Sequence, residues 1–144
     1  EFMDNVIPSA NSVMAENLSK MAVLDENREY KEQAMQMIQD IKPKIQHYGP
    51  FFAHWMQVYM QLVQPPYEIA INGTDAESKI RELQKYFLPG VVQAWSNQPS
   101  DLPLLRDRYR EDKTRIFVCR NYTCDEPSEN ISEVLNKLNL NNRI

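Results

Sequence analysis

The chain has 144 residues, of which 42% are hydrophobic and 25% charged, and its formal net charge is −4. These values fit one folded domain or two small subdomains and argue against disorder. A mildly acidic chain without clustered Lys and Arg has no electrostatic attraction for nucleic acid or an anionic membrane, so neither partner is expected. No apolar run approaches the roughly 18–20 residues that span a bilayer. With no secretory signal and only two cysteines, a cytoplasmic location is expected.

Two amphipathic helices are predicted at the start of the chain. The first covers about residues 11–23, with Ser9 or Asn11 as its N-cap, because apolar side chains recur there at helical spacing. The second covers about residues 28–46 and carries one apolar face. Pro43 lies inside it and predicts a kink or an early end, since proline removes a helical hydrogen bond.

A third helix is predicted over residues 51–63, which contain no charged side chain. A helix that is apolar on nearly all sides is expected to be buried on nearly all sides. We therefore expect it to lie between the helical first half and whatever follows. Pro65 and Pro66 end it and mark the boundary between the two halves.

The second half alternates strand and helix patterns. Strands are predicted at about residues 67–72, 91–95 and 114–119, and helices at residues 75–87 and after Asn130. Thr74 and Glu77 have the spacing of a capping box. This order predicts a parallel three-stranded sheet with right-handed crossovers. The fold class expected is α+β, with a helical segment (residues 1–64) packed on a small α/β subdomain (residues 67–144) and the third helix covering the sheet.

The two cysteines, Cys119 and Cys124, are candidates for a redox pair or for metal ligands. A thioredoxin-type pair has two intervening residues and a helix N-terminus, and this pair has neither. Zinc needs closer spacing and four ligands, and nothing brings His47 and His54 to the cysteines. The simpler interpretation is one buried and one loop thiol, although a reversible disulfide can form if the loop folds back. No metal site and no cofactor are expected.

A small anion site is a second hypothesis. Arg120 and Asn121 follow the third strand, and Thr74 leads into a helix N-terminus with free N–H groups. If the strands are parallel, these three residues lie at the same edge of the sheet, where open sheets bind ligands. The simpler alternative is that Arg120 forms a surface salt bridge and that Thr74 only caps its helix.

Four segments, in this order, carry a resemblance to a known family: residues 1–12 (EFMDNVIPSANS), 68–73 (EIAING), 87–89 (FLP) and 118–124 (VCRNYTC). Together they resemble the C-terminal end of the spermatogenesis-associated, thioredoxin-domain-containing family. The resemblance implies a much longer parent protein, with a thioredoxin-like domain and a helical toroid similar to N-acylglucosamine 2-epimerases and six-hairpin glycosidases. Two departures are Ala10, where the family usually has glycine, and the run at residues 106–110, where it has a glycine-bearing turn.

On this resemblance, the first three helices are the end of the toroid, and the N-terminal loop can face its cleft. Asp4 is then a candidate acid/base, Asn11 a candidate partner for sugar hydroxyls and Ser9 a candidate ligand residue. Ordinary N-capping by Ser9 and Asn11 is the simpler alternative. A second catalytic group would come from elsewhere in the parent, so this chain alone is expected to be inactive.

The function expected is therefore that of a structural and interaction module. It is the C-terminal part of a larger, carbohydrate-active protein, contacting the rest of that polypeptide or a second copy of itself through exposed helix faces. One alternative is a free-standing domain that binds a small ligand or anion. The second alternative is a thiol redox protein that uses the cysteine pair.

Overall fold

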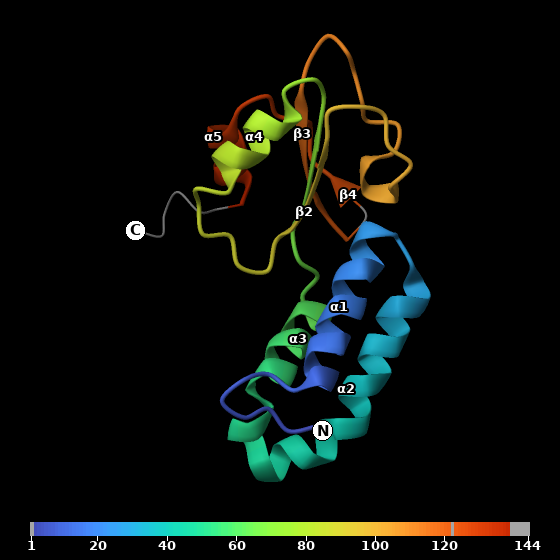
Figure 1. The fold of residues 1–144 in the computed structure, drawn as a ribbon, viewed down its shortest axis with the longest axis vertical. Helices are drawn as coiled ribbons and strands as arrows, with labels where there is room; N and C mark the ends of the chain where they lie inside the picture. Colours follow the sequence, from blue (N-terminus) through green and yellow to red (C-terminus); the bar gives the residue numbers. More distant parts are fainter. Residues whose placement is uncertain (1, 122, 139–144) are drawn as a thin grey trace. The chain divides into compact units, whose positions relative to one another are not determined.

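The computed structural model describes residues 2–121 and 123–138. The chain divides into two compact units, Glu1–Pro65 and Pro66–Ile144. The first contains only helices, and the second combines helices with a sheet (Figure 1). The fold is therefore mixed α+β, with each unit built around its own apolar cluster.

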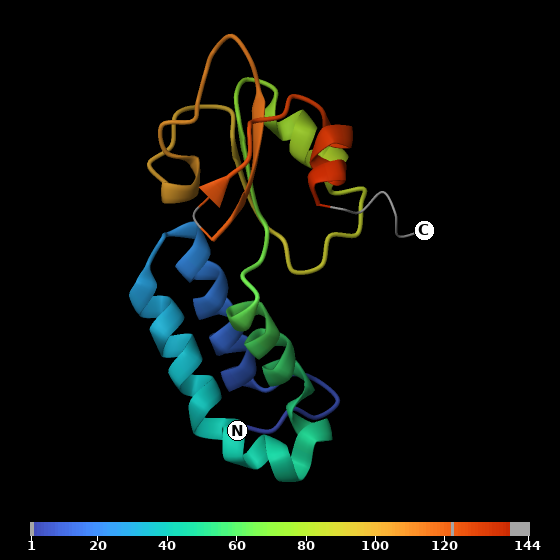
Figure 2. The same ribbon diagram turned by 180° about the vertical axis from the view of Figure 1, so that it is seen from behind.

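The helical unit contains α1 (Ala10–Leu24), α2 (Arg28–Tyr48), a 3-10 turn η1 (Gly49–Phe52) and α3 (Ala53–Val63). Ser9 is the N-cap of α1, because its side chain accepts a hydrogen bond from the Ser12 N–H, as predicted. The second helix continues through Pro43 to Tyr48, so the early end allowed for near Pro43 does not occur. Its ribbon bends in the last turns (Figure 2).

The core of the helical unit combines large side chains of the η1–α3 segment with small ones of α1. Phe52, Trp55 and Val58 are fully buried. The buried face of α1 consists of small side chains: Ser12, Ala15, Ser19 and Ala22. Small residues let helix backbones approach closely. As a result, the bulky apolar side chains of α1 are left on its other faces.

Within its unit, α3 is buried on one side only, which differs from the sequence prediction. Trp55, Val58 and Leu62 are buried, whereas Met56, Met60 and Val63 are exposed. Three helices pack around a single seam, so each can bury only the stripe that faces the other two. Although α3 carries no charged side chain, it is therefore not buried on all sides within its unit.

The α/β unit contains the strands β1 (Glu68–Asn72), β2 (Val92–Ser96), β3 (Arg115–Arg120) and β4 (Thr123–Cys124). Its helices are α4 (Ala76–Leu83), the 3-10 turn η2 (Pro103–Leu105) and α5 (Ile131–Lys137). The strand order is β2-β1-β3-β4 (Figure 1). Only β1 and β2 are parallel, and β3 is antiparallel to both β1 and β4.

The expectation of a parallel three-stranded sheet is thus wrong in the direction of β3 and in missing β4. The reason lies in the connection between β2 and β3. Ser96 ends β2 beside Asn72 of β1, and Arg115 begins β3 beside the same Asn72. The connection therefore leaves and re-enters the sheet at one end, whereas a parallel pair needs a crossover from end to end.

One face of the sheet packs against α4 and α5. Its apolar cluster joins strand residues Ile69, Ile71, Ile116 and Val118 to helix residues Ile80, Leu83, Ile131, Val134, Leu135 and Leu138. Within the α/β unit, α4 and α5 cover this face of the sheet. Phe87, the last residue of the helix predicted over residues 75–87, is 88% exposed because α4 ends at Leu83.

Among the described residues, no helix combines the length and the apolar character that crossing a membrane requires.

Candidate functional site

The side chain of Asp4 connects the beginnings of two helices of the helical unit. Its Oδ1 atom accepts hydrogen bonds from the Ser9 N–H at 2.9 Å and the Ser12 hydroxyl at 2.7 Å. Its Oδ2 atom accepts from the backbone N–H groups of His54 at 2.9 Å and Trp55 at 3.4 Å. The N-cap residue of α3 makes no side-chain capping bond of its own. Asp4, about 50 residues away in the sequence, therefore caps α3.

The titration of Asp4 follows from these contacts. Burial acts to raise the pKa of this carboxyl group, which is only 5% exposed. The hydrogen bonds from Ser9, Ser12, His54 and Trp55 outweigh burial and hold the pKa below its ordinary value of 3.8. A general acid or base that works near neutral pH needs the opposite shift. These contacts favour a structural role, and the catalytic role of Asp4 stays a prediction.

The other two residues of the predicted sugar site lie beside Asp4 in the sequence but differ in their surroundings. The Ser9 side chain is buried; its hydroxyl bonds to the Ser12 hydroxyl at 3.1 Å and accepts from the Ser12 N–H at 3.2 Å. Asn11 lies in the first turn of α1 and is half-buried. The Ser9 hydroxyl thus bonds to the first turn of the helix, and N-capping is the simpler of the two roles considered for this residue.

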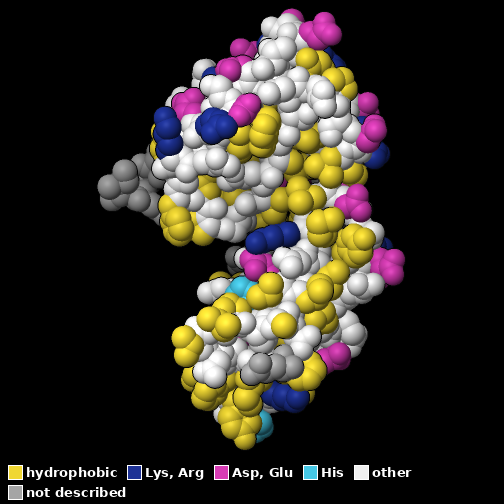
Figure 3. Space-filling view, in the orientation of Figure 1, with side chains coloured by type: hydrophobic (Ala, Val, Ile, Leu, Met, Phe, Trp, Pro, Cys, Tyr) yellow, Lys and Arg dark blue, Asp and Glu magenta, His cyan; other side chains and the backbone are white. Residues whose placement is uncertain are grey.

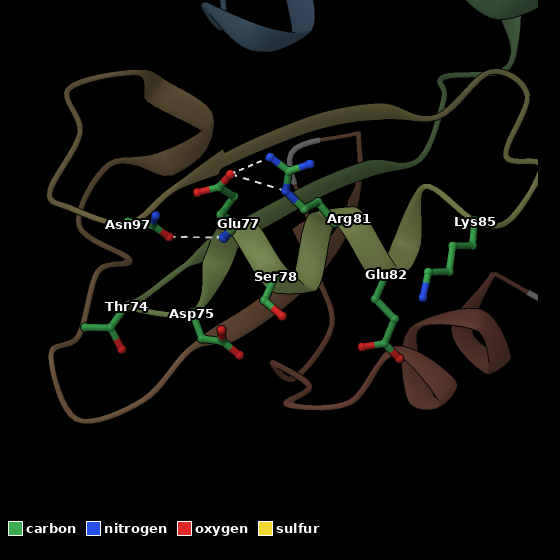
Figure 4. A pocket seen from close by; sticks show the side chains of 8 residues that line it. All are labelled: Thr74, Asp75, Glu77, Ser78, Arg81, Glu82, Lys85 and Asn97. Atoms are coloured by element: carbon green, nitrogen blue, oxygen red, sulfur yellow. Dashed lines mark hydrogen bonds and ion pairs between the residues drawn. The ribbon is translucent and has the colours of Figure 1, made fainter.

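The beginning of α4 forms an open, polar hollow (Figure 4). Its walls carry both signs of charge, and Glu77 binds Arg81, one turn further along α4, at 2.7 Å. The side-chain oxygen of Asn97 accepts a hydrogen bond from the Glu77 N–H at 3.1 Å. Asp75, not Thr74, is the N-cap residue, so the predicted capping box does not form. The helix start already has a protein acceptor where an anion was expected.

The structure places Thr74 and Arg120 at opposite ends of the sheet. Thr74 follows the carboxyl end of β1, where Asn72 pairs with Arg115. Arg120 ends β3 beyond Cys119, which pairs with Glu68 at the other end of β1. The antiparallel direction of β3 causes this separation. The three-residue anion site is therefore not assembled.

Arg120 and Asn121 have local roles instead. The Arg120 guanidinium lies 5.1 Å from the centre of the Tyr67 ring, a cation–π distance. Asn121 follows β3 with a φ of 51°, in the left-handed region that asparagine adopts more readily than most residues. It leads into β4, the strand that carries Cys124.

The two cysteines form a disulfide. They are direct partners in the antiparallel ladder of β3 and β4, which brings the loop back on the strand. The simpler interpretation, of two separate thiols, is therefore not what the structure shows. The Arg108 guanidinium lies against both sulfurs, with Nη1 3.3 Å from the Sγ of Cys119 and Nη2 3.4 Å from that of Cys124.

Arg108 is the residue of this site that sequence reasoning missed. Its guanidinium also lies 4.9 Å from the centre of the Phe117 ring, two residues before Cys119 on β3. No local pattern marks Arg108, because it comes from the polar connection between β2 and β3. A weak signal was the density of arginine in that connection, at positions 106, 108 and 110.

His54 Nε2 lies 3.3 Å from a Glu16 carboxylate oxygen, an ion-pair distance, but the geometry is not that of a hydrogen bond. In the described part of the chain, no group of three or more His, Cys, Asp or Glu side chains is placed to hold a metal ion.

Comparison with protein-family models, with curated proteins and with solved structures finds no match for this chain. The relation to the spermatogenesis-associated, thioredoxin-domain-containing family therefore remains a prediction that rests on the four sequence segments.

Proposed function

We propose that the chain is the C-terminal portion of a larger, carbohydrate-active, thioredoxin-domain-containing protein, in which it serves as a structural and interaction module. Further helices of the same polypeptide would contact its helical unit. The observation that carries the proposal is the apolar surface of that unit. Hydrophobic side chains spread over much of the helical unit in Figure 3.

The exposed apolar side chains form one line along each of two helices, α1 and α3. On α1, Met14, Leu18 and Met21 follow at spacings of four and three, which places them on one face. Met14 and Met21 are exposed, and Leu18 is half-buried between them. We call these residues the α1 stripe. The buried face of α1 carries only small side chains, so its larger apolar side chains are the ones left in water.

The same spacing recurs on α3, where Met56, Met60 and Val63 form what we call the α3 stripe. All three are exposed, and Met60 is 62% exposed. A helix with apolar residues on opposite faces is typical of one that packs on both sides. Stripes of this spacing fit the grooves of neighbouring α-helices, which is why the proposed occupant is helical.

The N-terminal segment adds to the apolar surface. Val6 is 96% exposed and Ile7 73% exposed. Asp4 and the Trp55 indole, which donates to the Phe2 carbonyl at 2.8 Å, hold the neighbouring residues against α3. Apolar side chains this exposed are characteristic of interaction surfaces. Without the parent helices, two copies of the chain should cover these surfaces for each other.

The test is sedimentation equilibrium of the purified chain over a wide range of concentration. The wild type should self-associate, and association should persist at high salt because it is apolar. The double variant Met21→Lys/Met60→Lys places one charge in each stripe and should shift the chain to monomer. The matched control, Gln36→Lys/Gln39→Lys, adds the same charge to the exposed side of α2 and should associate like wild type. A wild type that is monomeric throughout would refute the proposal.

A further inference from the structure

We propose that Cys119 and Cys124 form a thiol–disulfide exchange site for small thiols, in which Arg108 stabilises the Cys119 thiolate once the disulfide is opened. This proposal concerns the α/β unit alone and is independent of the interaction surface on the helical unit. Three observations support it: the pairing of the two cysteines in a short hairpin, the difference in their exposure, and the position of one guanidinium against both sulfurs.

The hairpin keeps the two sulfurs together whether or not they are bonded. Cys119 pairs with Cys124, and Arg120 pairs with Thr123, in the antiparallel ladder of β3 and β4. Backbone hydrogen bonding continues past the pair, since the Asp125 N–H donates to the Val118 carbonyl at 2.9 Å. Reduction removes the S–S bond but none of these backbone contacts. The reduced thiols therefore stay adjacent, and the disulfide can re-form without refolding.

The two sulfurs differ in access. Cys119 is 2% exposed, whereas Cys124 is an exposed residue of the edge strand β4. An incoming thiolate reaches a disulfide through the sulfur that solvent reaches. Cys124 is therefore the sulfur that is attacked, and Cys119 is the one that leaves.

Arg108 is placed to stabilise the sulfur that leaves. Its Nη1 is 3.3 Å from the Cys119 Sγ, and Phe117 holds the other side of the guanidinium in a cation–π contact. A hydrogen bond from a guanidinium to a thiolate is charge-assisted and stronger than one to a neutral disulfide. The contact therefore favours the reduced form.

The loop is built to present Arg108 in this way. The Arg106 guanidinium donates to the Asp101 carbonyl at 3.0 Å, and that of Arg110 donates to the Asp107 carbonyl at 3.4 Å. Both arginines thus brace the loop itself. Asp107, directly before Arg108, has a φ of 61°, in the left-handed region. Among the arginines at positions 106, 108 and 110, Arg108 is the one whose guanidinium contacts both sulfurs.

The exchange proceeds in two balanced steps. A small thiolate attacks the Cys124 Sγ, an S–S bond forms between them, and the Cys119–Cys124 bond breaks, with Cys119 leaving as a thiolate beside Arg108. A second thiolate attacks the small-thiol sulfur of this mixed disulfide and releases Cys124. Two small thiols are thereby oxidised to one disulfide, two electrons pass to the protein, and both cysteines end as thiols after taking up the two protons.

The first experiment titrates the folded chain in glutathione redox buffers, with alkylation and intact mass as the readout of the oxidised fraction. The wild type should convert reversibly between disulfide and dithiol while its tryptophan fluorescence remains that of the folded chain. The variant Arg108→Gln should shift the equilibrium constant about fivefold to tenfold toward the disulfide. Arg108→Lys keeps the charge but loses the planar guanidinium with its two donors, and its equilibrium constant should lie between those of wild type and Arg108→Gln.

The matched control is Arg120→Gln, which removes the same charge from the residue next to Cys119. Adjacent residues of a strand point to opposite faces, and the Arg120 guanidinium contacts Tyr67 instead. Its equilibrium constant should stay within about twofold of wild type, since an exposed charge on the other face is screened. Equal shifts in Arg108→Gln and Arg120→Gln, or a pair that is reduced only after unfolding, would overturn the proposal.

A second experiment does not depend on any arginine variant. Cys119→Ser leaves only the exposed sulfur, and Cys124→Ser leaves only the buried one. With oxidised glutathione as the probe, Cys119→Ser should form the mixed disulfide at least tenfold faster than Cys124→Ser, because access limits the rate. Equal rates, or a faster Cys124→Ser variant, would contradict the assignment of Cys124 as the exchanging sulfur.

Discussion

Replacing Asp4 tests whether its carboxylate holds the helical unit together. In Asp4→Asn, one carboxylate oxygen becomes an amide NH2 group, which cannot accept a hydrogen bond. Two of the four hydrogen bonds that Asp4 accepts are then lost, and the new NH2 group lies against groups that also donate. Loss of one helix cap costs about 0.5–2 kcal/mol, and a buried unsatisfied donor about 1–3 kcal/mol. The free energy of unfolding should therefore fall by about 2–3 kcal/mol at neutral pH.

The assay is urea unfolding followed by the fluorescence of Trp55, which donates to the Phe2 carbonyl beside Asp4. A Trp95→Phe background makes Trp55 the only tryptophan, so the signal reports on the helical unit. Asp40→Asn is the matched control, because Asp40 is exposed on α2 of the same unit. Its free energy of unfolding should change by no more than about 0.5 kcal/mol.

The pH dependence gives a second, independent check on Asp4. Its pKa is lower in the folded chain than its ordinary value of 3.8. The ionised carboxylate therefore stabilises the fold fully at pH values above the unfolded pKa, and this contribution is lost as pH falls through the folded pKa. The difference between wild type and Asp4→Asn should shrink as pH is lowered from 6 to about 3. A difference that grows on acidification, or that is below about 0.5 kcal/mol at neutral pH, would refute the reasoning.

Four further substitutions test the fold by urea unfolding. Gly73→Ala should destabilise the α/β unit by at least about 2 kcal/mol, because Gly73 has a φ of +138° and an added Cβ would lie 2.4 Å from the Cα of Thr114. Gly49→Ala, which has open space and helical dihedral angles, should be neutral or slightly stabilising, and a reversed order would contradict the structure. Asn97→Ala should lower the free energy of unfolding by about 0.5–1 kcal/mol, because it removes the acceptor at the start of α4. An unchanged free energy would show that this bond does not form in solution. Phe87→Ser should change stability by less than about 0.5 kcal/mol, whereas a loss of 2 kcal/mol or more would show that Phe87 is buried.

Local patterns predicted most helices and the cores beside them. The Ser9 cap and the buried face of α5, formed by Ile131, Val134, Leu135 and Leu138, were readable because both depend on residues within a few positions. These features follow from spacing alone.

Features that depend on distant partners were not readable. The direction of β3 is set by where a long polar connection re-enters the sheet, and no periodicity records that. The role of Asp4 as a helix cap involves His54 and Trp55, far along the chain, so no local pattern predicts it. The pairing of the cysteines depends on the short strand β4, which no periodicity in the sequence predicted.

The most direct test of the proposed interaction surface is methionine oxidation measured at low and high protein concentration. Peroxide oxidises exposed methionines, so the oxidation rates of Met14, Met21 and Met60 report whether the two stripes are covered. The account predicts that these rates fall as the chain associates, while the rate of Met37, half-buried on α2, stays constant. Oxidation of Met14, Met21 and Met60 at the same rate in dilute and concentrated protein would contradict it.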